Sequence, residues 1–151
     1  MTADARPKLV YQIIIKSPPE RVWEAITTPE FTSRYYYGCA LETGLTAGSP
    51  FTYHKPGGAP IIEGEVILSD PPKRLVHTYH SFWPPMNKDA PTKVTWELAS
   101  LPGGLTKVTV VHEDFEGETA TYQGLQSGGW AWILSNMKTL LETGEPLPEE
   151  Y

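Results

Sequence analysis

The 151 residues include 40% hydrophobic and 20% charged side chains, a balance typical of one globular domain with a sizeable core. The net charge of −6 leaves no basic patch that would neutralise phosphates, which argues against a nucleic-acid partner and an anionic membrane surface. The single cysteine, Cys39, permits no internal disulfide, and the sequence holds neither a signal peptide nor an apolar run of about 18 residues. We therefore expect a cytoplasmic protein without membrane insertion.

One strand and two short helices are expected first. Residues 9–16 are rich in β-branched side chains, as in a strand. Ser17 is the expected N-cap of the following helix, and Glu20 would complete a capping box. Pro29 should end this helix, and residues 29–34 should begin the second. The apolar face of the first helix would comprise Val22, Trp23 and Ile26.

The middle of the chain is predicted to form five more strands. They are expected at residues 49–55, 61–68, 74–82, 92–98 and 106–113. Proline and glycine separate them, and residues 82–91 read as an irregular loop. Strands joined by turns, without alternating βα units, imply an antiparallel sheet of about six strands.

Residues 122–142 carry the only long helical pattern in the sequence. Gly144 is the expected C-cap, and Pro146 would prevent continuation of the helix. We expect the sheet to bury its apolar side against this helix and to enclose a pocket with it. The apolar positions recur every three or four residues: Trp130, Ile133, Leu134, Met137, Leu140 and Leu141. The first four would face the pocket and the last two the closed core.

Taken in order, these segments resemble the START-like (SRPBCC) superfamily, in particular the branch related to the activator of heat-shock-protein-90 ATPase. The most specific match is Gly64-Glu65-Val66 followed by Asp70-Pro-Pro-Lys-Arg-Leu-Val-His-Thr78. Further matches are Ser17 to Ile26, Thr28-Pro29-Glu30, the tyrosines 35–37, Thr106 to Thr109 with His112, and Gly129-Trp130 with Ile133-Leu134 and Leu141-Glu142.

The resemblance implies an α+β, helix-grip fold. In this fold a curved antiparallel sheet of about six strands wraps around the C-terminal helix, two short helices follow the first strand, and a cavity lies between sheet and helix. A single domain would span residues 1–151, with loose ends at residues 1–7 and 145–151. A bulkier 82–91 loop and Tyr79, where relatives often carry tryptophan, depart from the pattern and concern the ligand rather than the fold.

No catalytic, metal or cofactor motif is assigned. The four histidines fall on separate strand candidates, and H-x-x-x-H, C-x-x-C, G-x-S-x-G, P-loop and dinucleotide motifs are lacking. Sheet folding could still bring His77 and His112 together. His77 and Tyr79 share one strand face, where they would either support acid–base catalysis or orient a ligand and satisfy hydrogen bonds. Glu63 and Glu65 are expected on a solvated face.

The aromatic content favours an amphipathic small-molecule site. Phe, Trp and Tyr make up 11% of the chain, and large rings with a polar tip suit apolar walls with few hydrogen bonds. Trp132 lies off the main helix face, where it would serve a homodimer contact or pack under the tail. The expected ligand-binding residues are Tyr35, Tyr37, Phe51, Tyr53, His77, Tyr79, Trp96, His112, Trp130 and Leu134.

Three functions are compatible with these features. The first is a binding protein for a hydrophobic, aromatic or lipid-like molecule, without chemistry of its own, and we predict this one. The second is a module that regulates a chaperone ATPase, as the name of the branch implies. The third is an enzyme of the cyclase, aromatase or hydrolase type that acts in the same cavity, because one fold hosts many functions.

Overall fold

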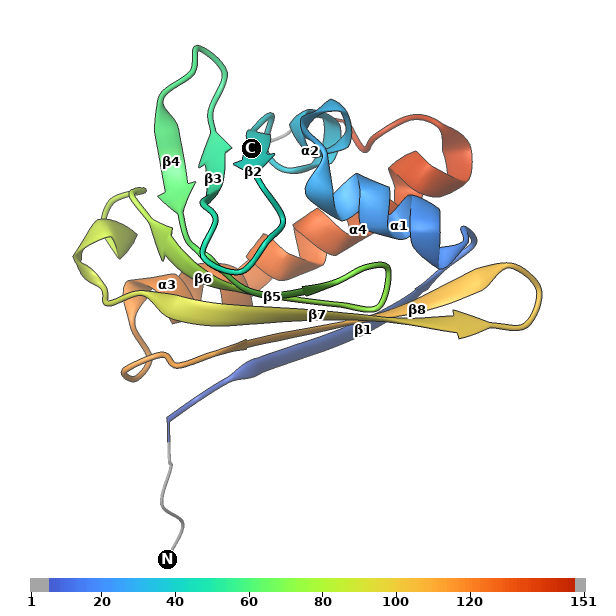
Figure 1. The fold of residues 1–151 in the computed structure, drawn as a ribbon. Coiled ribbons are helices and arrows are strands. Elements are labelled where there is room, and N and C mark those ends of the chain that lie inside the picture. Colours follow the sequence, from blue (N-terminus) through green and yellow to red (C-terminus); the bar gives the residue numbers. More distant parts are fainter. Residues whose placement is uncertain (1–5, 149–151) are drawn as a thin grey trace, which may run out of the picture.

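The computed structural model describes residues 6–148. A curved antiparallel sheet wraps around a long C-terminal helix, and two short helices pack beside that helix (Figure 1). The helices are α1 (Pro19–Thr27), α2 (Pro29–Tyr35), α3 (Ala120–Gly124) and α4 (Trp130–Thr143), with a 3-10 turn η1 (Met86–Lys88) and a segment η2 (Leu125–Gly129) in which the C-terminal helix kinks at Gly128. This arrangement confirms the predicted helix-grip fold.

The sheet has eight strands, two more than the sequence predicted. Their order is β1-β8-β7-β6-β4-β3-β2, β5 also pairs with β6, and all pairs are antiparallel. The strands are β1 (Leu9–Ile15), β2 (Ala40–Thr43), β3 (Phe51–His54), β4 (Pro60–Glu63), β5 (Val66–Asp70), β6 (Arg74–Ser81), β7 (Thr92–Leu101) and β8 (Leu105–Glu113).

The two additional strands have separate causes. β2 is only four residues long, too short for a clear alternation, and it is held by pairing with β3. The single strand predicted at residues 61–68 is divided at Gly64 into β4 and β5, which both pair with β6. A Cβ at Gly64 would overlap the carbonyl group of Thr78, so only glycine permits this close approach.

The first helix begins later than its predicted cap. The N-cap is Pro18, in an extended conformation, and no side chain caps the helix within residues 6–148. Pro19 restricts the residue before it to extended conformations, so the helix cannot include Pro18 and the capping box at Ser17 and Glu20 was wrong. Ser17 is buried, and its carbonyl oxygen accepts a hydrogen bond of 2.7 Å from the Thr106 hydroxyl.

The C-terminal helix consists of α3, η2 and α4 in succession. Gly144 ends it as predicted: its φ is +86°, and its N–H donates to the carbonyl oxygen of Leu140. Beyond the helix, the Leu147 N–H donates to the Asn136 side-chain oxygen at 2.7 Å, so the chain turns back onto α4. The loose ends expected at residues 1–7 and 145–151 lie in large part outside the described residues.

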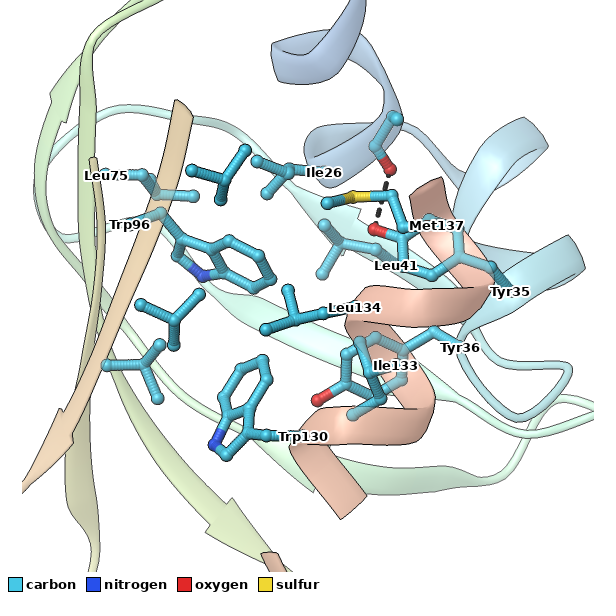
Figure 2. Close-up of a cluster of buried hydrophobic side chains, with 14 of the residues drawn as sticks. Ile26, Tyr35, Tyr36, Leu41, Leu75, Trp96, Trp130, Ile133, Leu134 and Met137 are labelled. Atoms are coloured by element: carbon cyan, nitrogen blue, oxygen red, sulfur yellow. Dashed lines mark hydrogen bonds between the residues drawn. The ribbon is translucent and has the colours of Figure 1, made fainter. Parts of the chain in front are cut away.

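The core lies between α4, α1 and the concave face of the sheet. Figure 2 shows Trp130, Ile133 and Leu134 extending from α4 into the cluster that contains Trp96 of the sheet. The rings of Trp96 and Trp130 meet edge to face, with centroids 5.4 Å apart. Such aromatic contact adds to the stabilisation from apolar burial, and it fixes the distance between helix and sheet.

Candidate functional site

A cavity of about 480 Å³ lies between one end of the sheet and the first half of the C-terminal helix. Its walls come from four parts of the chain: the segment after α2, the β3–β4 hairpin, β6 with the loop that follows it, and the α3–α4 region. The lining residues are Tyr36, Tyr37, Cys39, Lys55, Pro56, Ile61, Ile62, Tyr79, Ser81, Trp83, Met86, Gly124, Leu125, Gly129 and Ile133.

The wall is largely apolar, with a few polar atoms. Ser81 contributes a hydroxyl that accepts the N–H of Trp83 at 3.1 Å. The buried Tyr36 and Tyr79 contribute phenol rings, and Tyr36 also stacks on Tyr53 with centroids 4.1 Å apart. Apolar walls with few polar groups are typical of small-molecule sites, where the polar groups orient the ligand.

The wall is uncharged apart from one residue. Burial raises the pKa of the Tyr36 and Tyr79 phenols far above their usual range, so both stay protonated. Burial also raises the pKa of the Cys39 thiol to about 11, although the nearby positive charge of Lys55 opposes this. The thiol is therefore neutral and a weak nucleophile at pH 7. Among the residues that line the cavity, Lys55 alone is charged.

The loop that borders the cavity is joined to the helix. The side-chain oxygen Oδ2 of Asp89 accepts hydrogen bonds from both the backbone N–H and the hydroxyl of Thr121, at 2.8 and 2.6 Å. Trp83 and Met86, which belong to the same loop, contribute to the wall. The Asp89–Thr121 contact therefore holds one side of the mouth against the start of α3.

The ten predicted site residues fall into two groups. Tyr37 and Tyr79 line the cavity, and β6 does turn the face that carries His77 and Tyr79 inward. The other eight are buried behind the wall, in the packed core: Tyr35, Phe51, Tyr53, His77, Trp96, His112, Trp130 and Leu134.

Both ring nitrogens of His77 form hydrogen bonds inside the protein. The indole N–H of Trp96 donates to its Nε2 at 3.1 Å, so the ring proton is on Nδ1 and donates to the carbonyl oxygen of Thr78 at 2.8 Å. The ring also stacks on Phe51, with centroids 3.8 Å apart. Burial lowers the pKa of His77 to about 4, so the imidazole is neutral.

His112 belongs to a second chain of hydrogen bonds. The indole N–H of Trp130 donates to Nδ1 at 3.0 Å, which leaves the proton on Nε2 to donate to the Thr92 hydroxyl at 2.7 Å. That hydroxyl then donates to the carbonyl oxygen of Tyr79 at 3.2 Å. Burial lowers the pKa of His112 to about 3, with a further contribution from His77.

These bonds define what the two histidines do chemically. All four ring nitrogens have internal partners, and neither ring lines the cavity, so neither His77 nor His112 can reach a substrate proton there. Over residues 6–148, no group of three His, Cys, Asp or Glu side chains has the geometry of a metal site. The arrangement is suited to binding and orientation.

Sequence reasoning missed several wall residues that lie outside regular strands and helices. Lys55 and Pro56 belong to the turn between β3 and β4, and Trp83 belongs to the loop after β6. The Pro-Gly-Gly turn and the bulky 82–91 loop were the available signals. A Cβ at Gly124 would overlap the end of the Met86 side chain, so this glycine allows the helix to lie close to the loop after β6.

A curved antiparallel sheet closed around a C-terminal helix, with a cavity between them, defines a START-like protein. Residues 16–142 match the family model described as Activator of Hsp90 ATPase homolog 1-like protein. The chain therefore belongs to this family. No curated protein sequence matches it significantly.

Solved structures share the fold at low sequence identity. The Mesorhizobium loti protein MLL2253 has a TM-score of 0.75 and 23% identity, over 89% of this chain and 96% of its own. The Aha1 dimer from Colwellia psychrerythraea has a TM-score of 0.72 and 21% identity, with 91% and 98% covered. An HSP90 activator from Plasmodium falciparum has a TM-score of 0.73 and 22% identity, with 89% and 95% covered. Within residues 6–148, no helix is long and apolar enough to cross a membrane.

Proposed function

We propose that this protein binds a hydrophobic small molecule in the cavity between the β3–β4 hairpin, β6 and the C-terminal helix. The observation that carries the proposal is the cavity itself, whose volume of about 480 Å³ is within the usual range for ligand sites. Ile61, Ile62, Leu125 and Ile133 provide an apolar surface for the ligand, and Tyr36, Tyr79 and Ser81 provide the polar atoms that would orient it.

A thermal-shift screen of lipid-like and aromatic compounds tests this function. A ligand that binds the folded state alone raises its stability, by about 5–10 °C in midpoint at 100 times the Kd. One compound class should produce this increase. A screen in which no class raises the midpoint would overturn the proposal.

Two glycine variants make the screen specific to the cavity. Gly124→Leu places a branched side chain against Met86, where both residues line the cavity, and should remove the ligand-induced increase. Gly117→Leu is the matched control, because a Cβ there meets no atom within 4 Å and Gly117 is not part of the wall. An equal ligand effect in both variants would place the binding elsewhere.

Regulation of a chaperone ATPase is the second candidate function. Membership of the Activator of Hsp90 ATPase homolog 1-like family supports it, together with the similarity to an HSP90 activator. The measurement is the ATPase rate of purified Hsp90 with and without this protein. An unchanged rate at saturating protein would remove this candidate and leave the first intact.

We further propose that the protein acts in the cytoplasm and forms a homodimer. The free thiol of Cys39 is compatible with a reducing compartment, and the dimeric Colwellia relative supports self-association. Fractionation of cells and light scattering of the purified protein test the two statements separately. A monomer at micromolar concentration would contradict the second.

A further inference from the structure

We infer that the ligand is an amphipathic carboxylic acid, with its apolar body in the cavity and its carboxylate at the mouth beside Lys55. This inference rests on the proposed binding function and specifies the chemistry of the same site. It follows from the position of one cation on a largely apolar and otherwise uncharged wall.

The turn that carries Lys55 is fixed in place. The Lys55 N–H donates to the carbonyl oxygen of Ala59, and its own carbonyl oxygen accepts the N–H of Gly58, both at 2.9 Å. Pro56 lies against Gly38, so that a Cβ on Gly38 would be 3.3 Å from the proline ring. The lysine side chain therefore extends from a defined point beside the segment after α2, which forms the neighbouring wall.

The Lys55 ammonium is available to a ligand. The ion pairs of the described part of the chain join His54 to Glu42, Arg74 to Glu97, Lys93 to Glu113 and Lys138 to Glu142. None of them involves Lys55. Its charge also acts on the interior of the cavity, because it counteracts the rise in the pKa of the Cys39 thiol. A bound anion would supply the missing counter-charge.

The distribution of exposure sets the orientation of the ligand. Lys55 and Trp83 are exposed residues of the wall, Trp83 to 58%, whereas Leu125 and Ile133 are buried. A carboxylate that entered deep among the buried residues would lose its hydration without a counter-charge, at a prohibitive cost. With the carboxylate at the mouth, the head group stays partly hydrated while the hydrocarbon leaves water.

The net charge of −6 does not oppose this arrangement at physiological salt. Interactions beyond a Debye length of about 8 Å are largely screened, so the contact with Lys55 dominates over remote carboxylates. An exposed or partly exposed ion pair with a hydrogen bond should favour the acid over a neutral analogue by about three- to ten-fold in Kd.

The experiment compares decanoic acid with decan-1-ol by calorimetry at pH 7.5, below their aggregation limits. The unmodified protein should bind the acid three- to ten-fold more tightly. In Lys55→Gln this preference should disappear while the Kd of the alcohol stays the same. Lys55→Arg should keep the preference, and so should Lys73→Gln, which removes an exposed lysine from the turn between β5 and β6.

A salt titration of the unmodified protein gives a second test that needs no variant. Raising the ionic strength from about 0.05 to 0.5 M should weaken binding of the acid but not of the alcohol. Equal affinities for acid and alcohol, or a preference that survives in Lys55→Gln, would overturn the inference alone. Failure of both compounds to bind would also overturn the inference, whereas the proposed function would fall only if the thermal-shift screen finds no compound class that raises the midpoint.

Discussion

Two adjoining regions of the interior, a packed end and a cavity end, use aromatic residues in opposite ways, although the Tyr79 and His112 rings of the two regions meet with centroids 5.0 Å apart. Around His77 and His112, every ring nitrogen is paired and the tryptophans fill the space between sheet and helix. At the cavity end, Tyr36 and Tyr79 face a cavity of about 480 Å³. Aromatic richness alone therefore does not indicate a ligand site. What distinguishes the ends is whether neighbouring side chains complete the packing around each ring.

The largest expected effect comes from the packed end. Trp130→Ala should lower the free energy of unfolding by about 4 kcal/mol, because it removes a buried ring and leaves the Nδ1 atom of His112 without a donor. Urea unfolding measures the loss. The Kd for ligand of the folded fraction should stay within a factor of two or so, since Trp130 does not line the cavity. A large loss of ligand affinity in Trp130→Ala, with unchanged stability, would show that Trp130 belongs to the ligand site and not to the packed core.

The packed end should also make stability depend on pH. Both histidines have a lowered folded-state pKa, about 4 for His77 and about 3 for His112, so the unfolded chain binds more protons. Their contribution is fully present above the unfolded pKa of about 6.5 and is lost as the pH falls below it. Between pH 7 and pH 5 the free energy of unfolding should fall by about 2 kcal/mol for each histidine.

A single variant tests whether this pH dependence of the free energy of unfolding comes from the buried histidines. In His77→Gln, the amide can accept from Trp96 and donate to the carbonyl oxygen of Thr78 but cannot titrate. Urea unfolding of this variant at pH 7 and pH 5 should show about half of the loss. The half-buried His54 contributes with the opposite sign, because the carbonyl oxygen of Gly58 and the Glu42 carboxylate raise its pKa. An equal loss of stability between pH 7 and pH 5 in the unmodified protein and in His77→Gln would contradict the role of His77.

At the cavity end, the contact between loop and helix should have a smaller effect. Asp89→Ala removes the acceptor of two hydrogen bonds from Thr121 and should cost about 1–2 kcal/mol. Hydrogen exchange should increase in residues 82–91, and ligand affinity should fall because Trp83 and Met86 lose their support. Unchanged exchange in this loop would show that the contact does not hold the mouth.

The smallest effect on stability is expected at the wall. Tyr79→Phe removes one phenol oxygen and keeps the ring, so the free energy of unfolding should change by less than about 1 kcal/mol. The Kd of a ligand with a polar group should increase several-fold, as measured by calorimetry. The two variants Tyr79→Phe and Trp130→Ala thus separate effects on binding from effects on stability. If Tyr79→Phe lost as much stability as Trp130→Ala, this distinction would be wrong.

Local patterns predicted the elements of the fold well. The spacing of Trp130, Ile133 and Met137 identified α4, and Gly144 identified its end, because both depend on residues near in sequence. The division of the predicted strand at Gly64 could not be foreseen from the sequence, because glycine is required there by the carbonyl group of Thr78, which lies on another strand. Long-range contact, rather than local preference, decided that boundary.

The cavity wall was less predictable for the same reason. Tyr35, Tyr36 and Tyr37 are consecutive, but α2 ends at Tyr35 and the chain then turns irregularly, with a positive φ at Tyr37. No periodicity covers such a turn, so the sequence could not show that Tyr36 and Tyr37, and not Tyr35, reach the cavity. Lys55 likewise gains its position from the fold of a turn.

A kink at Gly128, whose backbone is non-helical, separates the C-terminal helix into two parts with different tolerance to change. Upstream of Trp130, Gly124, Leu125 and Gly129 border the cavity, whereas α4 supplies mainly core residues and contributes Ile133 to the cavity wall. A library of variants confined to residues 120–129 would therefore reshape the ligand site while α4 keeps its register on the sheet, which makes this helix a natural starting point for receptors of altered specificity.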